Sequence, residues 1–256
     1  MKIDETKCTG CGTCVPYCPA EAISLAERKG QQPAGGRKKQ DQVAVIDFDE
    51  CAECGVCLRS AKCPAGAIYQ QELVYPRSIR SLMSDVLTIA PESQISGRGT
   101  EEMKTNEVTG RFPRGVAGVA IEVGRPITGA RLRDVEKIAM AVAALNVEFE
   151  KINPTTSMMS DVKTGKFKDE LLNEKVLSAI IEFCVKVEQL PELFGILKTV
   201  EKQIDSVFSL DVACRLNPDG SNPTQSYIAS AGLWVAPNGK TNVGLGRPLI
   251  QEGLSK

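Results

Sequence analysis

Apolar and polar positions alternate with a period of two along four stretches in the second half of the chain. In the first of them, residues 116–123, the side chains expected on one face are Ala117, Val119, Ile121 and Val123. Successive side chains of a β-strand point to opposite faces, so this alternation predicts strands with one buried face. The four predicted strands cover residues 116–123, 147–152, 177–187 and 207–216.

Between these strands, apolar residues recur at the three- and four-residue spacing of an α-helix. One helix is expected from Leu132 to Leu145, just before Asn146. Asparagine tolerates the left-handed conformation that often ends a helix. A later helix is expected to begin at Pro191 and to reach Ile204, because proline is favoured in the first helical turn.

The resulting order, strand–helix–strand–strand–helix–strand, predicts an α+β fold. We expect a four-stranded antiparallel sheet with two helices on one face, the split-βαβ sandwich. In outline this βαββαβ order resembles ACT-type regulatory modules, although the arrangement hosts many functions. A C-terminal hairpin is expected from residues 228–235 and 242–245, turning at Pro237-Asn238-Gly239.

The sheet face opposite the helices is expected to point outward and to be either solvated or packed on another subunit. The polar residues expected on this face are Glu122, Glu182, Lys186, Asp211 and Arg215. A polar, glycine-rich stretch over residues 92–115 precedes the sheet. Long loops of this kind are often functional or disordered, so residues 96–114 are a candidate for contacting a partner.

A further helix is expected between Tyr75-Pro76 and Pro91, before that polar stretch. Its apolar stripe consists of Ile79, Leu82, Met83, Val86 and Leu87. We therefore predict three regions. Residues 1–75 form a cysteine-rich domain, residues 76–114 a helix and polar linker, and residues 115–256 an α+β domain.

The overall composition is that of an ordinary globular protein, with 42% hydrophobic and 25% charged residues. The net charge of −1 provides no basic field for nucleic acid. The longest apolar run, Ile138 to Leu145, is far shorter than the ~20 residues of a membrane span. The N-terminus, MKIDETKC, has no apolar signal region. We expect a cytoplasmic protein that binds neither nucleic acid nor membrane.

Cysteine and histidine contents narrow the possible chemistry. The chain has ten cysteines and no histidine, and eight of the cysteines precede residue 64. The absence of histidine excludes His-ligated zinc, Rieske-type centres, His-ligated haem and a histidine general base. With no export signal, so many cysteines favour metal binding over a disulfide framework.

The cysteine-rich region is an internal duplication. Ile3-Asp4 precedes Cys8 as Ile46-Asp47 precedes Cys51, and Cys18-Pro-Ala-Glu-Ala matches Cys63-Pro-Ala-Gly-Ala. Each copy is therefore expected to contain a short strand, a cysteine loop, a helical turn and a second short strand. The polar, locally basic segment between the copies, residues 27–42, is either a solvated loop or a docking strip for an acidic partner.

The first copy has the spacing C-x2-C-x2-C-x3-C-P, from Cys8 to Pro19. This run resembles that of bacterial-type 2[4Fe-4S] ferredoxins, in which the fourth cysteine ligates the other cluster. The resemblance covers residues 1–72 and implies two [4Fe-4S] clusters. It implies that one cluster is bound by Cys8, Cys11, Cys14 and Cys63, and the other by Cys51, Cys54, Cys57 and Cys18.

The second run departs from the family pattern because five residues, instead of three, separate Cys57 from Cys63. All eight ligands remain, and we expect the longer gap to make the two clusters differ in potential. The alternative is structural zinc, which also uses C-x2-C pairs. Two triplets at equal spacing, each followed by Cys-Pro, favour iron–sulfur chemistry.

Other residue groups carry weaker signals. Cys184 and Cys214 lie on strands that are not expected to be neighbours, so we expect ordinary free thiols there. Arg125, Arg131 and Arg133 surround a predicted helix start, where they either bind an anion or are solvated or paired with carboxylates. No dinucleotide- or phosphate-binding motif and no catalytic signature is present in the sequence.

From these observations we expect an iron–sulfur electron-transfer subunit. It would pass single low-potential electrons to or from a catalytic oxidoreductase partner that contains a flavin or a metal. The α+β domain would dock that partner in a hetero-oligomer of anaerobic metabolism. Two alternatives remain. One is a redox or metabolite sensor with an ACT-like ligand-binding domain, and the other is a flavin-dependent reductase in its own right.

Overall fold

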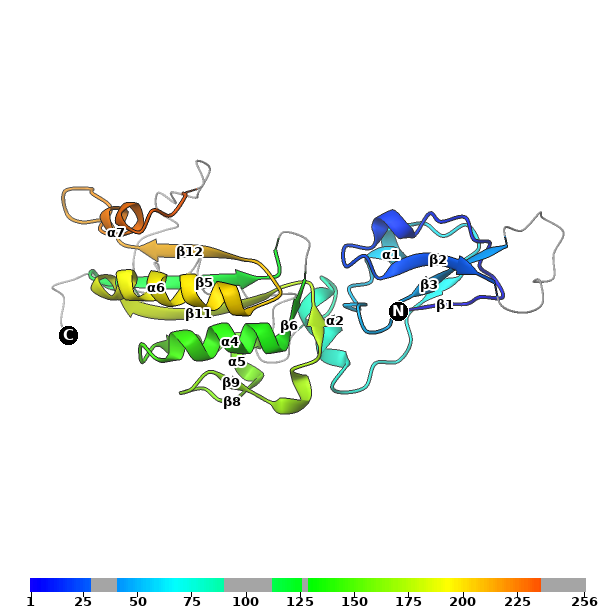
Figure 1. Cartoon of the computed structure of the whole chain (residues 1–256), viewed down its shortest axis with the longest axis horizontal. Helices are drawn as coiled ribbons and strands as arrows, with labels where there is room; N and C mark the ends of the chain where they lie inside the picture. The colour runs from blue at the N-terminus through cyan, green and yellow to red at the C-terminus, as the bar shows by residue number, and fades with distance from the viewer. Residues whose placement is uncertain (29–40, 90–111, 126–128, 236–256) are drawn as a thin grey trace.

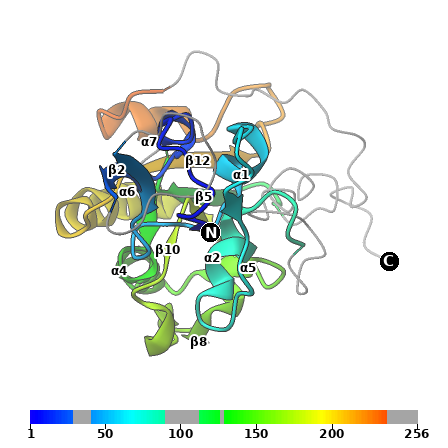
Figure 2. The same cartoon turned by 90° about the vertical axis from the view of Figure 1, so that its right-hand side faces the viewer.

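The computed structural model describes residues 1–28, 41–89, 112–125 and 129–235. Two domains lie side by side along the long axis of the molecule, with helix α2 (Ser78–Ser84) between them (Figure 1). The N-terminal domain runs from β1 to β4, and the C-terminal domain runs from β5 to α7. Viewed from the N-terminal end, the two domains overlap in projection, with α2 close to the chain start (Figure 2).

The N-terminal domain has the duplicated architecture predicted from its sequence. The first copy contains β1 (Lys2–Ile3), the 3-10 turn η1 (Val15–Tyr17) and β2 (Ile23–Glu27). The second contains β3 (Gln42–Ile46), α1 (Val56–Ser60) and β4 (Ile68–Tyr69). Strand β1 pairs antiparallel with β4, and β2 with β3. Because each pair takes one strand from each copy, the two copies fold as one unit.

The C-terminal domain is built on a four-stranded antiparallel sheet. Its strands are β5 (Val116–Val123), β7 (Glu148–Phe149), β11 (Ala179–Lys186) and β12 (Phe208–Cys214), in the order β12-β5-β11-β7. Strand β5 has the bounds predicted from the alternation, and β7 is shorter than the predicted residues 147–152. Helices α4 (Leu132–Ala143) and α6 (Leu190–Val200) lie side by side in front of the sheet (Figure 1).

The core of this domain lies between the sheet and the two helices. Val119 and Ile121 of β5, Phe183 of β11 and Ile138 of α4 are at most 1% exposed. Burying each such side chain stabilises the fold by about 1.5–3 kcal/mol. Asn146 follows α4 with a φ of 54°, the left-handed conformation expected from its sequence. Alternation in strands and spacing in helices therefore identified the residues of this core.

Short elements extend the domain at its edges. They are β6 (Ala130–Arg131), α5 (Pro154–Ser157), β8 (Met159–Asp161), β9 (Lys166–Phe167), η2 (Asp169–Leu171), β10 (Lys175–Val176), η3 (Val187–Gln189) and η4 (Glu201–Gln203). Strand β8 pairs with β9, and β6 with β10. Strand β10 also packs against α2, so this corner of the C-terminal domain faces the N-terminal domain.

The junction between the domains is held by charged contacts. Arg131 Nη2 lies 2.7 Å from Asp49 Oδ2 and 2.6 Å from Glu50 Oε1. Lys175 pairs with the second carboxylate oxygen of Glu50. Arg131 holds the pKa of Asp49 below its ordinary value, and Lys175 does the same for Glu50. Arg131 therefore pairs with carboxylates, as one of the two sequence interpretations expected, and Arg125 pairs likewise with Glu122.

The prediction of an outward-facing sheet surface is wrong at Glu182, which is 3% exposed. Asn153 Nδ2, just before α5, donates a hydrogen bond to Glu182 Oε2 at 2.5 Å. On the same face, the ring of Phe112 lies over Gly118, and Phe112 is 2% exposed. Segments outside the sheet thus cover part of this face, which strand alternation alone does not reveal.

The predicted hairpin is also corrected, because residues 225–230 form helix α7 (Gln225–Ser230). Gly232, two residues after the end of the helix, has a φ of 63°. Gly232 N–H donates to Ala229 O and Leu233 N–H to Ile228 O, the hydrogen-bond pattern of a Schellman cap. The end of α7 and its glycine cap therefore lie inside residues 228–235, and the strand predicted there is wrong. The second predicted hairpin strand, residues 242–245, lies outside the described residues.

Helix α2 is shorter than predicted. It ends at Ser84, and Asp85 turns the chain by accepting the Leu87 N–H on its side chain at 2.9 Å. Val86 and Leu87 are 67% and 69% exposed, so they do not extend the apolar stripe. The predicted helix stop at Pro91, most of the candidate contact loop 96–114 and residues 29–40 of the basic segment lie outside the described residues.

Within the described residues, no helix combines the length and the apolar character that crossing a lipid bilayer requires.

Replacing Gly118 by alanine tests the covered sheet face. A Cβ at Gly118 would overlap the ring of Phe112, so we expect G118A to lower the free energy of unfolding by about 1–3 kcal/mol. The control is G195A. Nothing lies within 4 Å of a Cβ at Gly195, in the middle of α6, and alanine there is expected to stabilise by about 0.5–1 kcal/mol. Urea denaturation followed by circular dichroism measures both, and two shifts of the same sign would contradict the packing described.

Candidate iron–sulfur centres

The cysteine loops of the two copies have matching backbone conformations. Gly12 and Gly55, each directly after the second cysteine of its run, have φ values of 72° and 67°. Gly10 and Glu53 occupy equivalent positions before that cysteine, with φ values of 68° and 53°. Left-handed residues at both positions let each loop curl, so that its three cysteines face a common space.

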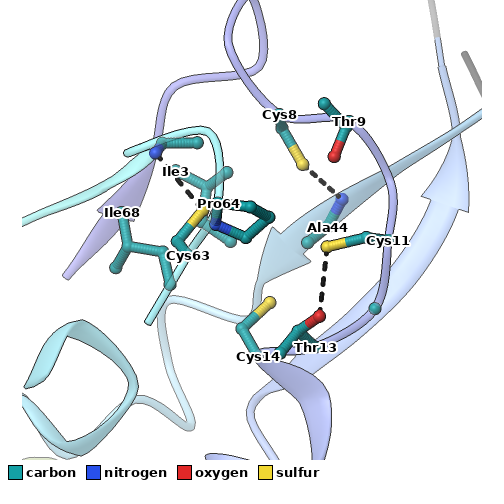
Figure 3. Close-up of a pocket in the computed structure, with 12 residues that line it drawn as sticks. Ile3, Cys8, Thr9, Cys11, Thr13, Cys14, Ala44, Cys63, Pro64 and Ile68 are labelled. Atoms are coloured by element: carbon teal, nitrogen blue, oxygen red, sulfur yellow. Dashed lines mark hydrogen bonds between the residues drawn. The ribbon is translucent and has the colours of Figure 1, made fainter. Parts of the chain in front are cut away.

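The first cavity has about 330 Å³ of space between atoms, part of which is open to solvent (Figure 3). Cys8, Cys11 and Cys14 from the first copy line it together with Cys63 from the second. Ile3, Ala44, Pro64 and other small or apolar residues form the rest of its wall. The four cysteines that the family resemblance assigns to one cluster are therefore brought together here.

The second cavity has about 310 Å³ of space between atoms, part of which is open to solvent, and it has the complementary set of cysteines. Cys51, Cys54 and Cys57 come from the second copy, and Cys18 comes from the first. Cys14 and Cys18 flank the single turn η1 yet line different cavities. The duplication therefore produces two cavities, each with three cysteines from one copy and one from the other.

Backbone N–H groups point at several of these sulfurs. Ala22 N–H donates to Cys18 Sγ at 3.2 Å, and Ala67 N–H donates to Cys63 Sγ at 3.4 Å. The two contacts are equivalent, because in each copy the chain turns after Cys-Pro-Ala and places the N–H of the residue four positions after the cysteine against its sulfur. Ala44 N–H donates to Cys8 Sγ at 3.4 Å (Figure 3). Hydrogen bonds of this kind favour the thiolate form and are one of the factors that set cluster potentials.

The two cavities differ in their exposure to solvent. Cys11 at the first cavity is exposed, and a hydrogen bond from Thr13 lowers its pKa. Cys51, Cys54 and Cys57 are all buried, and burial raises the pKa of Cys57 to about 12. Without a bound cation, the buried thiols stay protonated at neutral pH. Binding a positively charged iron centre therefore releases protons from the second set.

The donor set fits an iron–sulfur cluster. None of the ten cysteines forms a disulfide, and four of them surround each cavity. Within the described residues, no three cysteine or carboxylate side chains converge closely enough to hold a single metal ion. Cys184 and Cys214 lie apart from both cavities, on strands separated by β5, and form no disulfide.

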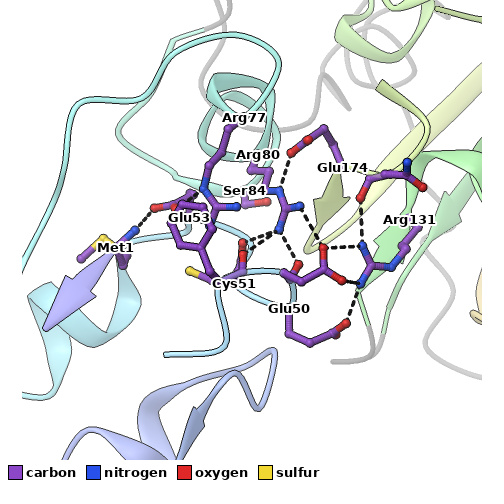
Figure 4. Close-up of polar contacts among 12 residues, drawn as sticks. Met1, Glu50, Cys51, Glu53, Arg77, Arg80, Ser84, Arg131 and Glu174 are labelled. Atoms are coloured by element: carbon purple, nitrogen blue, oxygen red, sulfur yellow. Dashed lines mark hydrogen bonds and ion pairs between the residues drawn. The ribbon is translucent and has the colours of Figure 1, made fainter. Parts of the chain in front are cut away.

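Glu53 is a buried carboxylate within the second cysteine loop that sequence reasoning missed. It is 0% exposed, and Arg77 Nη2 lies 2.6 Å from its Oε1. The amino group of Met1 pairs with its other oxygen (Figure 4). Burial raises the pKa of Glu53, but these two cations outweigh it and lower the pKa below its ordinary value. The only sequence signal was a charged residue at the position where the first copy has Gly10.

Replacing Glu53 by alanine should destabilise the N-terminal domain. The change leaves Arg77 and the Met1 amino group buried without their partner, which costs about 3–5 kcal/mol. The matched control is E21A, because Glu21 also has a positive φ but is exposed, and its change should stay within about 0.5 kcal/mol. Anoxic guanidinium titrations followed by circular dichroism measure both variants. Equal stability of the two would show that the buried pair contributes nothing.

Comparisons with known proteins agree with this donor set. Residues 1–24 match the family described as the 4Fe-4S binding domain. Ferredoxin-3 of Rhodobacter capsulatus is 37% identical over 76 residues, which cover 25% of this chain and 73% of that protein. Ferredoxin-1 of the same organism is 44% identical over 54 residues, covering 21% of this chain and 62% of that protein.

A larger protein is also similar to part of this chain. An iron–sulfur subunit of the CoB–CoM heterodisulfide reductase of Methanocaldococcus jannaschii is 37% identical over 76 residues, covering 27% of this chain and 11% of that protein. No solved structure matches the chain. These matches support a 4Fe-4S cofactor and an iron–sulfur electron-transfer role. Through its N-terminal domain, the chain belongs to the bacterial-type ferredoxin family.

Proposed function

We propose that the N-terminal domain binds two [4Fe-4S] clusters with crossed ligation and transfers single low-potential electrons. In this proposal, Cys8, Cys11, Cys14 and Cys63 hold the first cluster, and Cys51, Cys54, Cys57 and Cys18 hold the second. The observation that carries it is the presence of two cavities, each lined by four cysteines drawn from both copies. Each cluster, when bound, supplies a one-electron redox centre.

The chain contributes ligands, insulation and proximity. Buried alanine and isoleucine side chains around the sulfurs limit the access of water to both centres. Cys14 and Cys18 bind different clusters in this proposal, although only η1 separates them along the chain. Four residues span at most ~14 Å of chain. The two centres are therefore neighbours, and this separation favours electron exchange between them.

We further propose that the C-terminal domain docks a catalytic oxidoreductase subunit that contains a flavin or a metal. The matched heterodisulfide reductase protein is by its name the iron–sulfur subunit of a reductase, which supports a similar role in a complex. No catalytic residue is assigned within this chain. The docking domain would occupy residues 115–256, joined to the ferredoxin domain of residues 1–75 by residues 76–114.

Iron counts in double variants test the crossed ligation. The wild-type chain should contain about eight irons and about eight sulfides, and C18A should retain about four of each. C18A/C57A should also retain about four, because both changes affect the second cluster. C18A/C14A should lose nearly all iron, because one ligand of each cluster is removed. The reverse pattern in the two double variants would show local ligation, and stoichiometric zinc without sulfide would exclude clusters altogether.

Anoxic co-purification tests the partner. A tagged full-length chain should co-purify with a catalytic subunit in stoichiometric amount, and that subunit should carry a flavin or metal spectrum. A homo-oligomer that binds a metabolite would instead favour the sensor alternative. Flavin remaining on this chain after iron removal would favour the reductase alternative, and either result would contradict the electron-transfer subunit.

A further inference from the structure

The first cysteine of each copy has its backbone carbonyl held by an arginine, but the two arginines come from different places. Arg28 Nη2 donates to Cys8 O at 2.6 Å and follows β2 within the N-terminal domain. Arg80 Nη1 donates to Cys51 O at 2.9 Å and belongs to α2, outside the duplicated unit. The equivalent contact at the second cavity is therefore supplied by the element that joins the domains.

Arg80 is buried and connects the second cavity to the C-terminal domain. The residue is 3% exposed, and its Nη1 also donates to Asp49 O at 2.5 Å. Its Nε, on the opposite edge of the guanidinium, pairs with Glu174 of the C-terminal domain (Figure 4). The guanidinium thus has a cysteine ligand on one side and a carboxylate from the other domain on its far side.

A second arginine adds to this arrangement. Arg59 Nη2 donates to Cys54 O at 2.7 Å and lies 2.9 Å from Asp85 Oδ1, directly after α2. Arg80 and Arg59 each contact the backbone carbonyl of a cysteine directly, whereas their carboxylate partners lie beyond the guanidinium groups. The positive end of each ion pair therefore faces the second cavity. Among the described residues, the first cavity has this kind of contact at Cys8 alone.

Positive charge beside a cluster favours its reduced form, because reduction adds an electron to the centre. The effect is larger for a buried charge, which water screens less than an exposed one. We propose that Arg80 raises the reduction potential of the second cluster above that of the first, and that the C-terminal domain adjusts this potential through Glu174. This inference rests on the proposed two-cluster function.

An electron direction follows from this difference. With both clusters bound, an external one-electron donor at the exposed Cys11 side would lose one electron to the first cluster. The higher potential beside Arg80 would then favour transfer of that electron to the second cluster, next to the domain junction. The coupling is reciprocal, so reduction of the second cluster also tightens the contact of Arg80 and α2 with the cysteine loop.

Removing the positive charge of Arg80 and, separately, the negative charge of Glu174 tests the inference, because the two changes should shift the potential in opposite directions. In the full-length, cluster-loaded chain, R80Q should lower the second potential because it removes the cation. E174Q should raise that potential because it removes the closer of two carboxylates that offset the charge of Arg80, the other being Asp49 at 3.8 Å from Nη2, and R80K should restore most of the wild-type value. Protein-film voltammetry measures both potentials, and hyperfine-shifted NMR signals of the cysteine β-protons assign each to its cluster. The first potential should stay unchanged in all three variants.

Two controls separate this effect from other causes. R133Q removes an exposed positive charge from the start of α4 and should leave both potentials unchanged. R131Q removes the junction pairs with Asp49 and Glu50 without removing a contact to a cysteine, and should shift the second potential less than R80Q does. A shift in R131Q as large as in R80Q would overturn the inference, because loosening of the junction would then explain both.

The test does not depend on the stability of the R80Q variant alone. If R80Q fails to retain its second cluster, E174Q and R80K still carry the test. Shifts of the same sign in R80Q and E174Q, or no shift in E174Q, would overturn the role of Arg80 while about eight irons per chain still support the two-cluster function. Loss of that iron stoichiometry in the wild-type chain would instead overturn the proposed function itself.

Discussion

The exchange of one cysteine between the two copies is the constraint on which the N-terminal domain depends. Each cavity takes three cysteines from one loop and the fourth from the other copy, so neither half provides a complete site alone. The strand pairs β1–β4 and β2–β3 follow the same rule. Backbone pairing and cysteine placement therefore require the same register between the copies, and a shift of one would disrupt the other.

The two copies have diverged within this shared frame. Where the first loop has Gly10, the second has Glu53 in the same left-handed conformation, held by two buried cations. A non-glycine residue in that conformation costs roughly 1–2 kcal/mol, and burying a charge adds to the cost. Arg77, which satisfies Glu53, lies directly before α2 and also stacks on the ring of Phe48, 3.3 Å from its centroid. The second loop is thus built around contacts that the first loop lacks.

Local patterns predicted much of this structure. Cysteine spacing brought out the duplication and the two sets of four residues, and alternation gave β5 with its observed bounds. Where prediction failed, a contact from a distant segment decided the outcome. Glu182 is buried because Asn153 reaches it, although its place in the alternation is that of an outward residue. Arg80 looked like one polar position in a short helix, and nothing near it in sequence indicates Cys51 or Glu174 as its partners.

The position of Glu174 has a consequence for how the protein matures during synthesis. All eight cysteines that line the cavities precede residue 64, whereas the carboxylate that holds Arg80 in place is made much later. A ribosome that has released the cysteine loops has not yet produced strand β10 or its neighbours. The surroundings of the first cavity are therefore complete early in translation. Those of the second are finished last, when the C-terminal domain folds against α2.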